Sequence, residues 1–278
     1  MGDRQVPGTI LGASALLLDL DGTLYAAGAP VPGAPETVAA LRRAAVPFRF
    51  VTNTTSRPRA ALVERLRQYG FEAAPDEMLT PVIAASTIAR TRGWHTLAPF
   101  LPAPALTDLA GFDLRGGTSG RPAPTTPEAV LIGDLGEQWT YALMQEAFSY
   151  LLGGAQLIAL SRDRYWRRGD EIALDAGPFV AGLEYATSRD AILAGKPSVE
   201  FFRAAVASLP PGVADRGVAM VGDDLWSDVR GAQDAGYRGW LVRTGKFQDQ
   251  ALRDSGVVPD RILNSVADLR PTVEGSAA

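Results

Sequence analysis

Short apolar runs alternate with amphipathic stretches along most of this 278-residue chain. The run Leu16–Leu18 is continuously apolar, which is typical of a strand covered on both faces. Residues 57–69 place Leu62 and Leu66 on one face at helical spacing, and Gly70 suits the position just after such a helix. This alternation predicts βαβ units that build a parallel sheet.

The same reasoning assigns the other regular elements. Thr140 is the expected N-cap of a helix over 141–152, which Gly153 and Gly154 would end. We predict further strands over 48–51, 129–132, 156–160, 191–193, 217–221, 240–242 and 262–263. We predict further helices over 35–45, 81–92, 177–186 and 227–235, and one that begins after Ser198.

The middle of the chain differs in character from its two ends. Residues 99–127 are rich in Pro, Gly and Thr, and residues 161–176 are polar and aromatic. We therefore predict an α/β fold in which a second domain, residues 93–188, is inserted into a parallel-sheet core. The core would consist of residues 1–92 and 189–278, so its sheet would close across the insertion.

Composition narrows the classes of function. The net charge of −4 argues against a nucleic-acid surface, because binding to a phosphate backbone needs a concentrated basic patch. The chain has no cysteine, which excludes disulfides and thiolate catalysis, and its single histidine, His95, argues against a Ser-His-Asp triad. We see no signal peptide in MGDRQVPGTI and no apolar run long enough to span a membrane, so we expect a cytoplasmic protein.

Two carboxylates follow the first apolar strand. Asp19 and Asp21 are two residues apart, so an extended strand would point both to the same side. They would repel each other unless a cation lay between them or one held a proton. The pair therefore indicates either a hard metal ion with oxygen ligands or a nucleophile beside an acid. A capped turn is the structural alternative, since Asp and Gly are common in turns.

Four polar groups along the chain each directly follow a predicted strand. In an open parallel sheet such strand ends lie at one edge, where ligands bind. Carboxylates suit Mg²⁺, while a lysine and a hydroxyl suit phosphoryl oxygens, so the set predicts phosphoryl transfer. The groups are Asp19 with Asp21, Thr52 with Asn53, Lys196, and Asp223 with Asp224.

In order and spacing these groups resemble the four motifs of the haloacid dehalogenase (HAD) superfamily of phosphohydrolases, subfamily IIA. This resemblance spans nearly the whole chain and implies a Rossmann-like core with an α/β cap domain at 93–188. The segments 177–184 and 242–246 resemble a branch with NagD-like and nitrophenylphosphatase-like enzymes and with phospholysine phosphohistidine inorganic pyrophosphate phosphatase-like proteins. The four motifs are Asp19-Leu20-Asp21-Gly22-Thr23, Thr52-Asn53, Lys196 in Gly-Lys-Pro-Ser, and Gly222-Asp223-Asp224 continuing to Asp228.

The resemblance assigns catalytic and metal-binding roles to the first and fourth motifs. Asp19 would attack phosphorus and form an aspartyl-phosphate, and Asp21 would be the general acid and then the general base. The side chains of Asp19 and Asp223, with the backbone carbonyl of Asp21, would hold Mg²⁺. Asp228 would orient Lys196 or metal-bound waters. Asp224 would either lie behind the direct metal ligands, as Asp228 does, or be a solvated turn residue.

The resemblance also assigns the substrate contacts. Thr52, the Asn53 backbone and Lys196 would bind phosphoryl oxygens of a small phosphorylated substrate, which could include phosphate esters, P–N bonds or pyrophosphate. The chain departs from cap-bearing relatives at Ser161-Arg162-Asp163, where they often carry Asn-x-Asp. Arg162 could therefore contact an anionic substrate or simply be solvated, and Tyr165–Arg168 could cover the site or belong to cap packing and surface.

We therefore expect a Mg²⁺-dependent HAD-type phosphatase that acts through an aspartyl-phosphate. Two other classes stay open: a phospho-acceptor signalling domain and a phosphate-ligand-binding protein that has lost catalysis. The second aspartate after Asp19 and the predicted insertion disfavour the first, because a receiver domain is small and lacks a cap. The presence of Asp19, Asp21, Lys196 and Asp223 disfavours the second. A homodimer formed through the cap is expected only by analogy.

Overall fold

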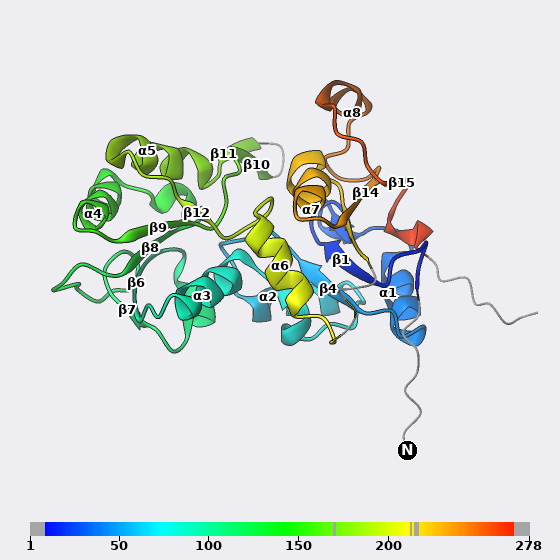
Figure 1. The fold of residues 1–278 in the computed structure, drawn as a ribbon, viewed down its shortest axis with the longest axis horizontal. Helices are drawn as coiled ribbons and strands as arrows, with labels where there is room; N and C mark the ends of the chain where they lie inside the picture. The colour runs from blue at the N-terminus through cyan, green and yellow to red at the C-terminus, as the bar shows by residue number, and fades with distance from the viewer. Residues whose placement is uncertain (1–8, 169–170, 212, 214–216, 270–278) are drawn as a thin grey trace, which may run out of the picture. The chain divides into compact units, whose positions relative to one another are not determined.

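The computed structural model describes residues 9–168, 171–211, 213 and 217–269, which form two compact units (Figure 1). The first unit contains residues 1–52, 63–79 and 197–278, and the second contains residues 53–62 and 80–196. The insertion predicted over 93–188 lies wholly within the second unit. The division into core and cap domains at those bounds stays a prediction.

A six-stranded parallel sheet forms the centre of the first unit, in the order β15-β14-β13-β1-β4-β5. All five residues of β1 are buried, as the continuous apolar run predicted. A short antiparallel pair, β2 and β3, follows β1. The strands are β1 (Ala15–Asp19), β2 (Tyr25–Ala26), β3 (Ala29–Pro30), β4 (Phe48–Val51), β5 (Met78–Leu79), β13 (Val218–Gly222), β14 (Arg238–Val242) and β15 (Arg261–Leu263).

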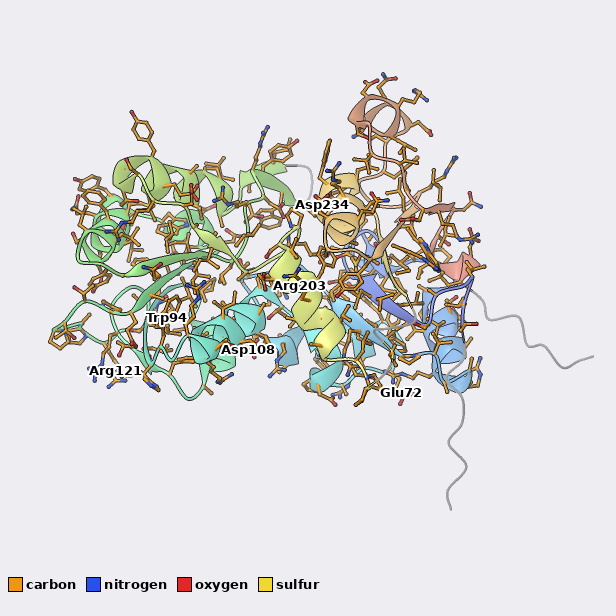
Figure 2. The ribbon with its side chains drawn as sticks, viewed as in Figure 1. Glu72, Trp94, Asp108, Arg121, Arg203 and Asp234 are labelled. Carbon is orange, nitrogen blue, oxygen red and sulfur yellow. The ribbon has the colours of Figure 1, made fainter. Side chains whose placement is uncertain are left out.

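The first unit also contains helices, some of them with one buried apolar face. The helix α6 (Val199–Ala207) buries Phe201 and Phe202, while Arg203 points outward from it (Figure 2). The segment predicted as one helix over 227–235 is a π-helical turn, Leu225–Arg230, that runs into α7 (Gly231–Asp234). The other helices are α1 (Ala34–Arg43), α2 (Arg59–Gln68), which spans the boundary between the units in sequence, and α8 (Asp249–Ser255).

The second unit has its own parallel sheet, in the order β12-β9-β8-β6-β7. A separate antiparallel hairpin, β10 with β11, lies in the segment 161–176 that carried no strand prediction. The strands are β6 (Thr96–Phe100), β7 (Asp113–Leu114), β8 (Ala129–Ile132), β9 (Gln156–Ala159), β10 (Tyr165–Arg168), β11 (Glu171–Leu174) and β12 (Ile192–Leu193).

The second unit contains the α-helices α3 (Pro81–Thr91), α4 (Tyr141–Leu152) and α5 (Gly177–Thr187). Apolar side chains of α4 and α5 share one buried cluster with β6, β8 and β9. Trp139 stacks on Phe179 at 4.6 Å and on Phe100 at 5.9 Å between ring centroids. As predicted, Thr140 caps α4 by accepting a hydrogen bond from the Leu143 backbone N–H.

The predicted fold class, an α/β protein with a Rossmann-like parallel-sheet core, is confirmed. One strand assignment is wrong. The strand before Lys196, predicted for the same sheet as β1, is β12 and pairs with β9 in the second sheet. Within the described part of the chain, none of the helices has the length and apolar character needed to cross a membrane.

Candidate active site

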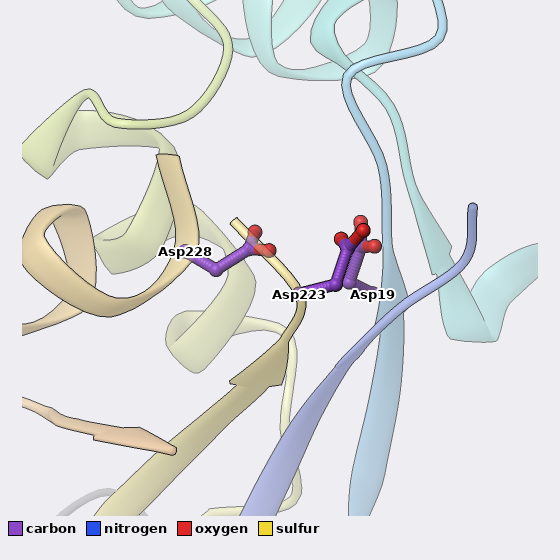
Figure 3. A group of neighbouring side chains, drawn as sticks. All are labelled: Asp19, Asp223 and Asp228. Atoms are coloured by element: carbon purple, nitrogen blue, oxygen red, sulfur yellow. The ribbon is translucent and has the colours of Figure 1, made fainter. Parts of the chain in front are cut away.

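Three buried carboxylates meet in the first unit. Asp19, Asp223 and Asp228 offer ligand oxygens that all lie within 4.8 Å of one another (Figure 3). Their residues are only 6 %, 3 % and 1 % exposed, respectively. Such a group of hard oxygen donors matches the ligand preference of a divalent cation such as Mg²⁺.

Strand register explains why these aspartates meet. Asp19 ends β1, and Asp223 directly follows β13, which is the parallel neighbour of β1 with Leu18 opposite Val221. Both carboxylates therefore emerge at the carboxyl edge of the sheet, where ligands bind in open α/β sheets. Asp228 reaches the same edge from the π-helical turn that begins after Asp224.

The electrostatics of the cluster favour a cation. Burial raises the pKa of Asp223 well above its ordinary value, and the charges of Asp19 and Asp228 raise it further. The backbone N–H and the charge of Lys246 act in the opposite direction. A divalent cation held by the three side chains would let all of them stay ionised, so this donor set fits Mg²⁺.

The loop after β14 closes over this edge of the sheet. Lys246 donates its backbone N–H to Asp223 Oδ2 at 2.6 Å, and the Thr244 hydroxyl donates to the Gly22 carbonyl at 2.5 Å. At Gly245, φ is +58°, and an added Cβ would overlap both the Asp223 carboxylate and Gly22. The Thr244–Lys246 segment thus ties the first motif to the fourth.

Asp224, next to Asp223 of the buried cluster, forms hydrogen bonds and an ion pair. Its carboxylate accepts the backbone N–H groups of Trp226 and Ser227, both at 2.9 Å, and so caps the π-helical turn. Its carboxylate also pairs with Lys246 Nζ at 3.1 Å. Burial raises the pKa of Asp224, but the Lys246 charge and these N–H donors outweigh burial and lower it below the ordinary value. In return, Asp228 accepts the Asp224 backbone N–H at 3.1 Å.

The first motif holds its two aspartates in different surroundings. Asp19 is buried and accepts a hydrogen bond from the Thr23 hydroxyl at 3.3 Å. Asp21 is exposed and accepts a hydrogen bond from the Tyr25 hydroxyl at 3.1 Å. Burial is the largest cause that raises the pKa of Tyr25, and the charge of Asp21 raises it further. The phenol therefore stays protonated and remains a hydrogen-bond donor.

The second and third motifs meet within the second unit through Asn53. Its side-chain amide pairs with the Lys196 backbone: Nδ2 donates to the carbonyl at 3.0 Å, and Oδ1 accepts the N–H at 2.8 Å. Nδ2 also contacts Asp163 Oδ2 at 3.4 Å. Lys196 is buried. Thr52, which is buried directly after β4, belongs to the first unit.

The segment that departs from the expected Asn-x-Asp pattern has specific partners. Arg162 forms an ion pair with Glu184, and Asp163 contacts Asn53. Tyr165 and Trp166 are exposed on β10. The side chains of residues 167 and 168, which were also candidates to cover the site, lie outside the described residues.

Several contributors to the site were not assigned roles from the sequence, among them Tyr25, Thr244 and Lys246. The segment 242–246 carried a family resemblance but no role, because its contacts with Gly22 and Asp223 join distant parts of the chain. Tyr25 follows the first motif directly, but sequence spacing alone does not place its hydroxyl beside Asp21.

Comparison with known proteins identifies the family. A haloacid dehalogenase-like hydrolase model matches residues 16–101, and a HAD-hydrolase-like model matches residues 193–269. The chain is 41 % identical over 234 residues to haloacid dehalogenase-like hydrolase domain-containing protein 2 of Bos taurus, covering 84 % of this chain and 85 % of that protein. It is 35 % identical over 265 residues to human phospholysine phosphohistidine inorganic pyrophosphate phosphatase, covering 93 % of each.

Solved structures agree with this assignment. The 4-nitrophenylphosphatase of Thermotoga maritima superposes with a TM-score of 0.83 and 26 % identity, covering 95 % of this chain and 98 % of that one. A glycerol phosphate phosphatase of Mycobacterium tuberculosis, solved in complex with magnesium, gives a TM-score of 0.79 and 25 % identity, covering 93 % of this chain and 77 % of that one.

The chain belongs to the haloacid dehalogenase-like hydrolase family. The predicted resemblance to that superfamily and to its phosphatase-containing branch is therefore confirmed, as is the prediction that the chain is an enzyme of this hydrolase class.

Proposed function

We propose that this chain is a Mg²⁺-dependent phosphatase that hydrolyses small phosphorylated molecules through an aspartyl-phosphate on Asp19. The observation that carries this proposal is the buried cluster of Asp19, Asp223 and Asp228 at the carboxyl edge of a parallel sheet. Family membership supports the hydrolase class, and the cluster supplies both a nucleophile and oxygen ligands for a metal.

The metal would be held by residues of the first unit. The side chains of Asp19 and Asp223 are the proposed ligands, together with the backbone carbonyl of Asp21. Asp228, which lies within the same cluster, would bind the metal directly or through water. When bound, Mg²⁺ would neutralise part of the phosphoryl charge.

In the first chemical step, a carboxylate oxygen of Asp19 attacks phosphorus and the bond from phosphorus to the leaving-group oxygen breaks. Asp21 gives its proton to that oxygen, which leaves as an alcohol. In the second step, Asp21 takes a proton from water as the water oxygen attacks phosphorus. The bond from phosphorus to Asp19 then breaks, which restores the Asp19 carboxylate and releases inorganic phosphate.

Thr52, the Asn53 backbone and Lys196 are the proposed contacts for the phosphoryl oxygens, as the family motifs imply. The Asn53 side chain supports this role indirectly, because two of its hydrogen bonds hold the Lys196 backbone. Asp224 has a positioning role in our proposal, since it caps the turn that carries Asp228.

Residues 93–188 are the proposed cap domain, and we propose that it limits substrates to small molecules. Relatives named for glycerol phosphate, for nitrophenyl phosphate and for phospholysine, phosphohistidine and inorganic pyrophosphate define the classes to test. Fold alone does not select among these substrates. A panel of phosphate monoesters, phosphoramidates and pyrophosphate, compared by kcat/KM, would identify the preferred class.

Turnover of p-nitrophenyl phosphate with Mg²⁺ tests the proposed function. The wild-type protein should release phosphate over many turnovers, and Asp19→Asn should not, because an amide is a very poor nucleophile. A phospho-acceptor signalling domain would take up phosphate without comparable turnover, and an inactive binding protein would release none. Cytoplasmic localisation and a homodimer remain predictions, which cell fractionation and light scattering of the purified protein would check.

A further inference from the structure

The hydroxyl of Tyr25 donates a hydrogen bond to Asp21 Oδ2 at 3.1 Å. We propose that Tyr25 is a positioning residue that holds the Asp21 carboxylate in the orientation needed for proton transfer. This inference rests on the proposed function, in which Asp21 is the general acid and general base. It adds a residue that acts through Asp21 and lies outside the four family motifs.

The two partners differ in how firmly they are held. Tyr25 is only 3 % exposed, whereas Asp21 is exposed. The Tyr25 ring packs on Tyr69 with 5.3 Å between centroids, and the Arg65 guanidinium lies 5.9 Å from the ring centroid. A fixed, buried phenol can therefore restrict the rotamers of the exposed carboxylate that accepts its hydrogen bond.

Backbone contacts place the phenol at this position. The Gly22 N–H donates to the Tyr25 carbonyl at 2.7 Å, and the Tyr25 N–H donates to the Leu20 carbonyl at 3.2 Å. Asp21 and Tyr25 also form an isolated β-bridge. The chain therefore turns back on itself between Leu20 and Tyr25, and this turn brings the two side chains together.

The hydrogen bond has a direct consequence for catalysis. Because one Asp21 oxygen accepts from the phenol, rotation of the carboxylate is restrained, and so is the direction of its second oxygen. Proton transfer depends steeply on such alignment. Loss of the phenol hydroxyl should therefore weaken general acid catalysis most where the leaving group depends on a proton.

The test compares phenyl phosphate with p-nitrophenyl phosphate, which have similar shapes but leaving groups of different basicity. Tyr25→Phe removes only the hydroxyl and keeps the ring that packs on Tyr69. The matched control is Tyr69→Phe, which removes a hydroxyl from the neighbouring ring. Thermal unfolding of both variants should stay close to that of the wild type, because neither substitution removes ring packing.

We expect Tyr25→Phe to lower kcat/KM about tenfold for phenyl phosphate and less than about threefold for p-nitrophenyl phosphate, whose phenolate leaves with little help from an acid. Tyr69→Phe should change the two values equally or leave both unchanged. Adding Tyr25→Phe to Asp21→Asn should cause less than about a twofold further loss, because the group that Tyr25 positions is already gone.

Equal losses on the two substrates, no loss on either, or a full additional loss in the Asp21→Asn background would each overturn the positioning role. Equal losses accompanied by a lower Tm would assign Tyr25 to fold stability instead. Failure of the proposed function itself would be seen separately, because Asp21→Asn with Tyr25 intact would then show no dependence on the leaving group.

Discussion

The backbone N–H of Lys246 donates to Asp223 Oδ2 at 2.6 Å and so fixes one carboxylate of the buried cluster from a loop more than twenty residues further along the chain. The residue before it, Gly245, has no room for a side chain, because a Cβ would overlap that same carboxylate. The loop after β14 is therefore part of the proposed metal site, although it supplies none of the clustered carboxylates.

Gly245→Ala should displace Asp223 and reduce catalysis. The new methyl group would push on the carboxylate and on Gly22, and a misplacement of this kind typically costs up to about a hundredfold in rate. We expect kcat/KM for p-nitrophenyl phosphate to fall by about ten- to a hundredfold, with a weaker apparent affinity for Mg²⁺. Steady-state kinetics across a Mg²⁺ titration would measure both changes.

Gly256→Ala is the matched control for this variant. Gly256 also has a positive φ, +68°, but nothing lies within 4 Å of a Cβ built there. It should therefore lose only about 1 kcal/mol of stability through backbone strain and keep its activity. Similar kinetic losses in both variants would show that strain, and not contact with Asp223, explains the effect.

Asp223→Asn should raise the stability of the metal-free protein and at the same time abolish its stabilisation by Mg²⁺. Removing one of three buried carboxylates relieves repulsion, so the metal-free variant should unfold at a higher Tm than the metal-free wild type. Mg²⁺ should raise the Tm of the wild type but not of the variant, because binding to the native state alone stabilises it. Asp234→Asn, at an exposed ion pair with Arg230, should keep the Mg²⁺ shift. An unchanged Mg²⁺ shift in Asp223→Asn would contradict the assigned metal site.

Asp108→Ala should destabilise the start of α2. Asp108, which is labelled in Figure 2, accepts the backbone N–H of Arg59, the first residue of that helix, on Oδ2 at 2.8 Å. Loss of such a cap typically costs about 1 kcal/mol, which thermal or urea unfolding would detect. Asp113→Ala removes a part-buried ion pair with Arg115 and an exposed one with Arg121, and no contact with a helix N-terminus, so it should have a smaller effect. Equal losses in the two variants would argue against the capping role.

Local patterns were sufficient to predict the elements that have a strong local signal. The bounds of β4, β8 and α4 match the predictions, because continuous apolar runs and the Thr140 cap act within a few residues. Strand β6 was missed because Pro99 interrupts its apolar pattern, and proline is unusual inside a sheet. The hairpin of β10 and β11 was missed because its apolar side chains are exposed and do not alternate with a buried face.

Nonlocal pairing limited the prediction of the site. The carboxylates of Asp19 and Asp223 were expected to meet at one sheet edge, and the register of β1 with β13 brings them together. Nothing local to residues 191–193 indicates which sheet they join, and the strand before Lys196 was therefore placed in the wrong one. Contacts that join distant segments, such as the hydrogen bond from Thr244 to Gly22, could likewise not be predicted from local sequence patterns.

The measurement that tests the central claim most directly is rapid acid quenching of Asp21→Asn after mixing with ³²P-labelled p-nitrophenyl phosphate and Mg²⁺. Loss of the general base should slow hydrolysis of the intermediate, so labelled protein should accumulate. We predict that peptide mapping will place the label on Asp19 and that the double variant Asp19→Asn/Asp21→Asn will take up none. Label on another residue, or phosphate release by Asp19→Asn at a rate near that of the wild type, would contradict the proposed mechanism.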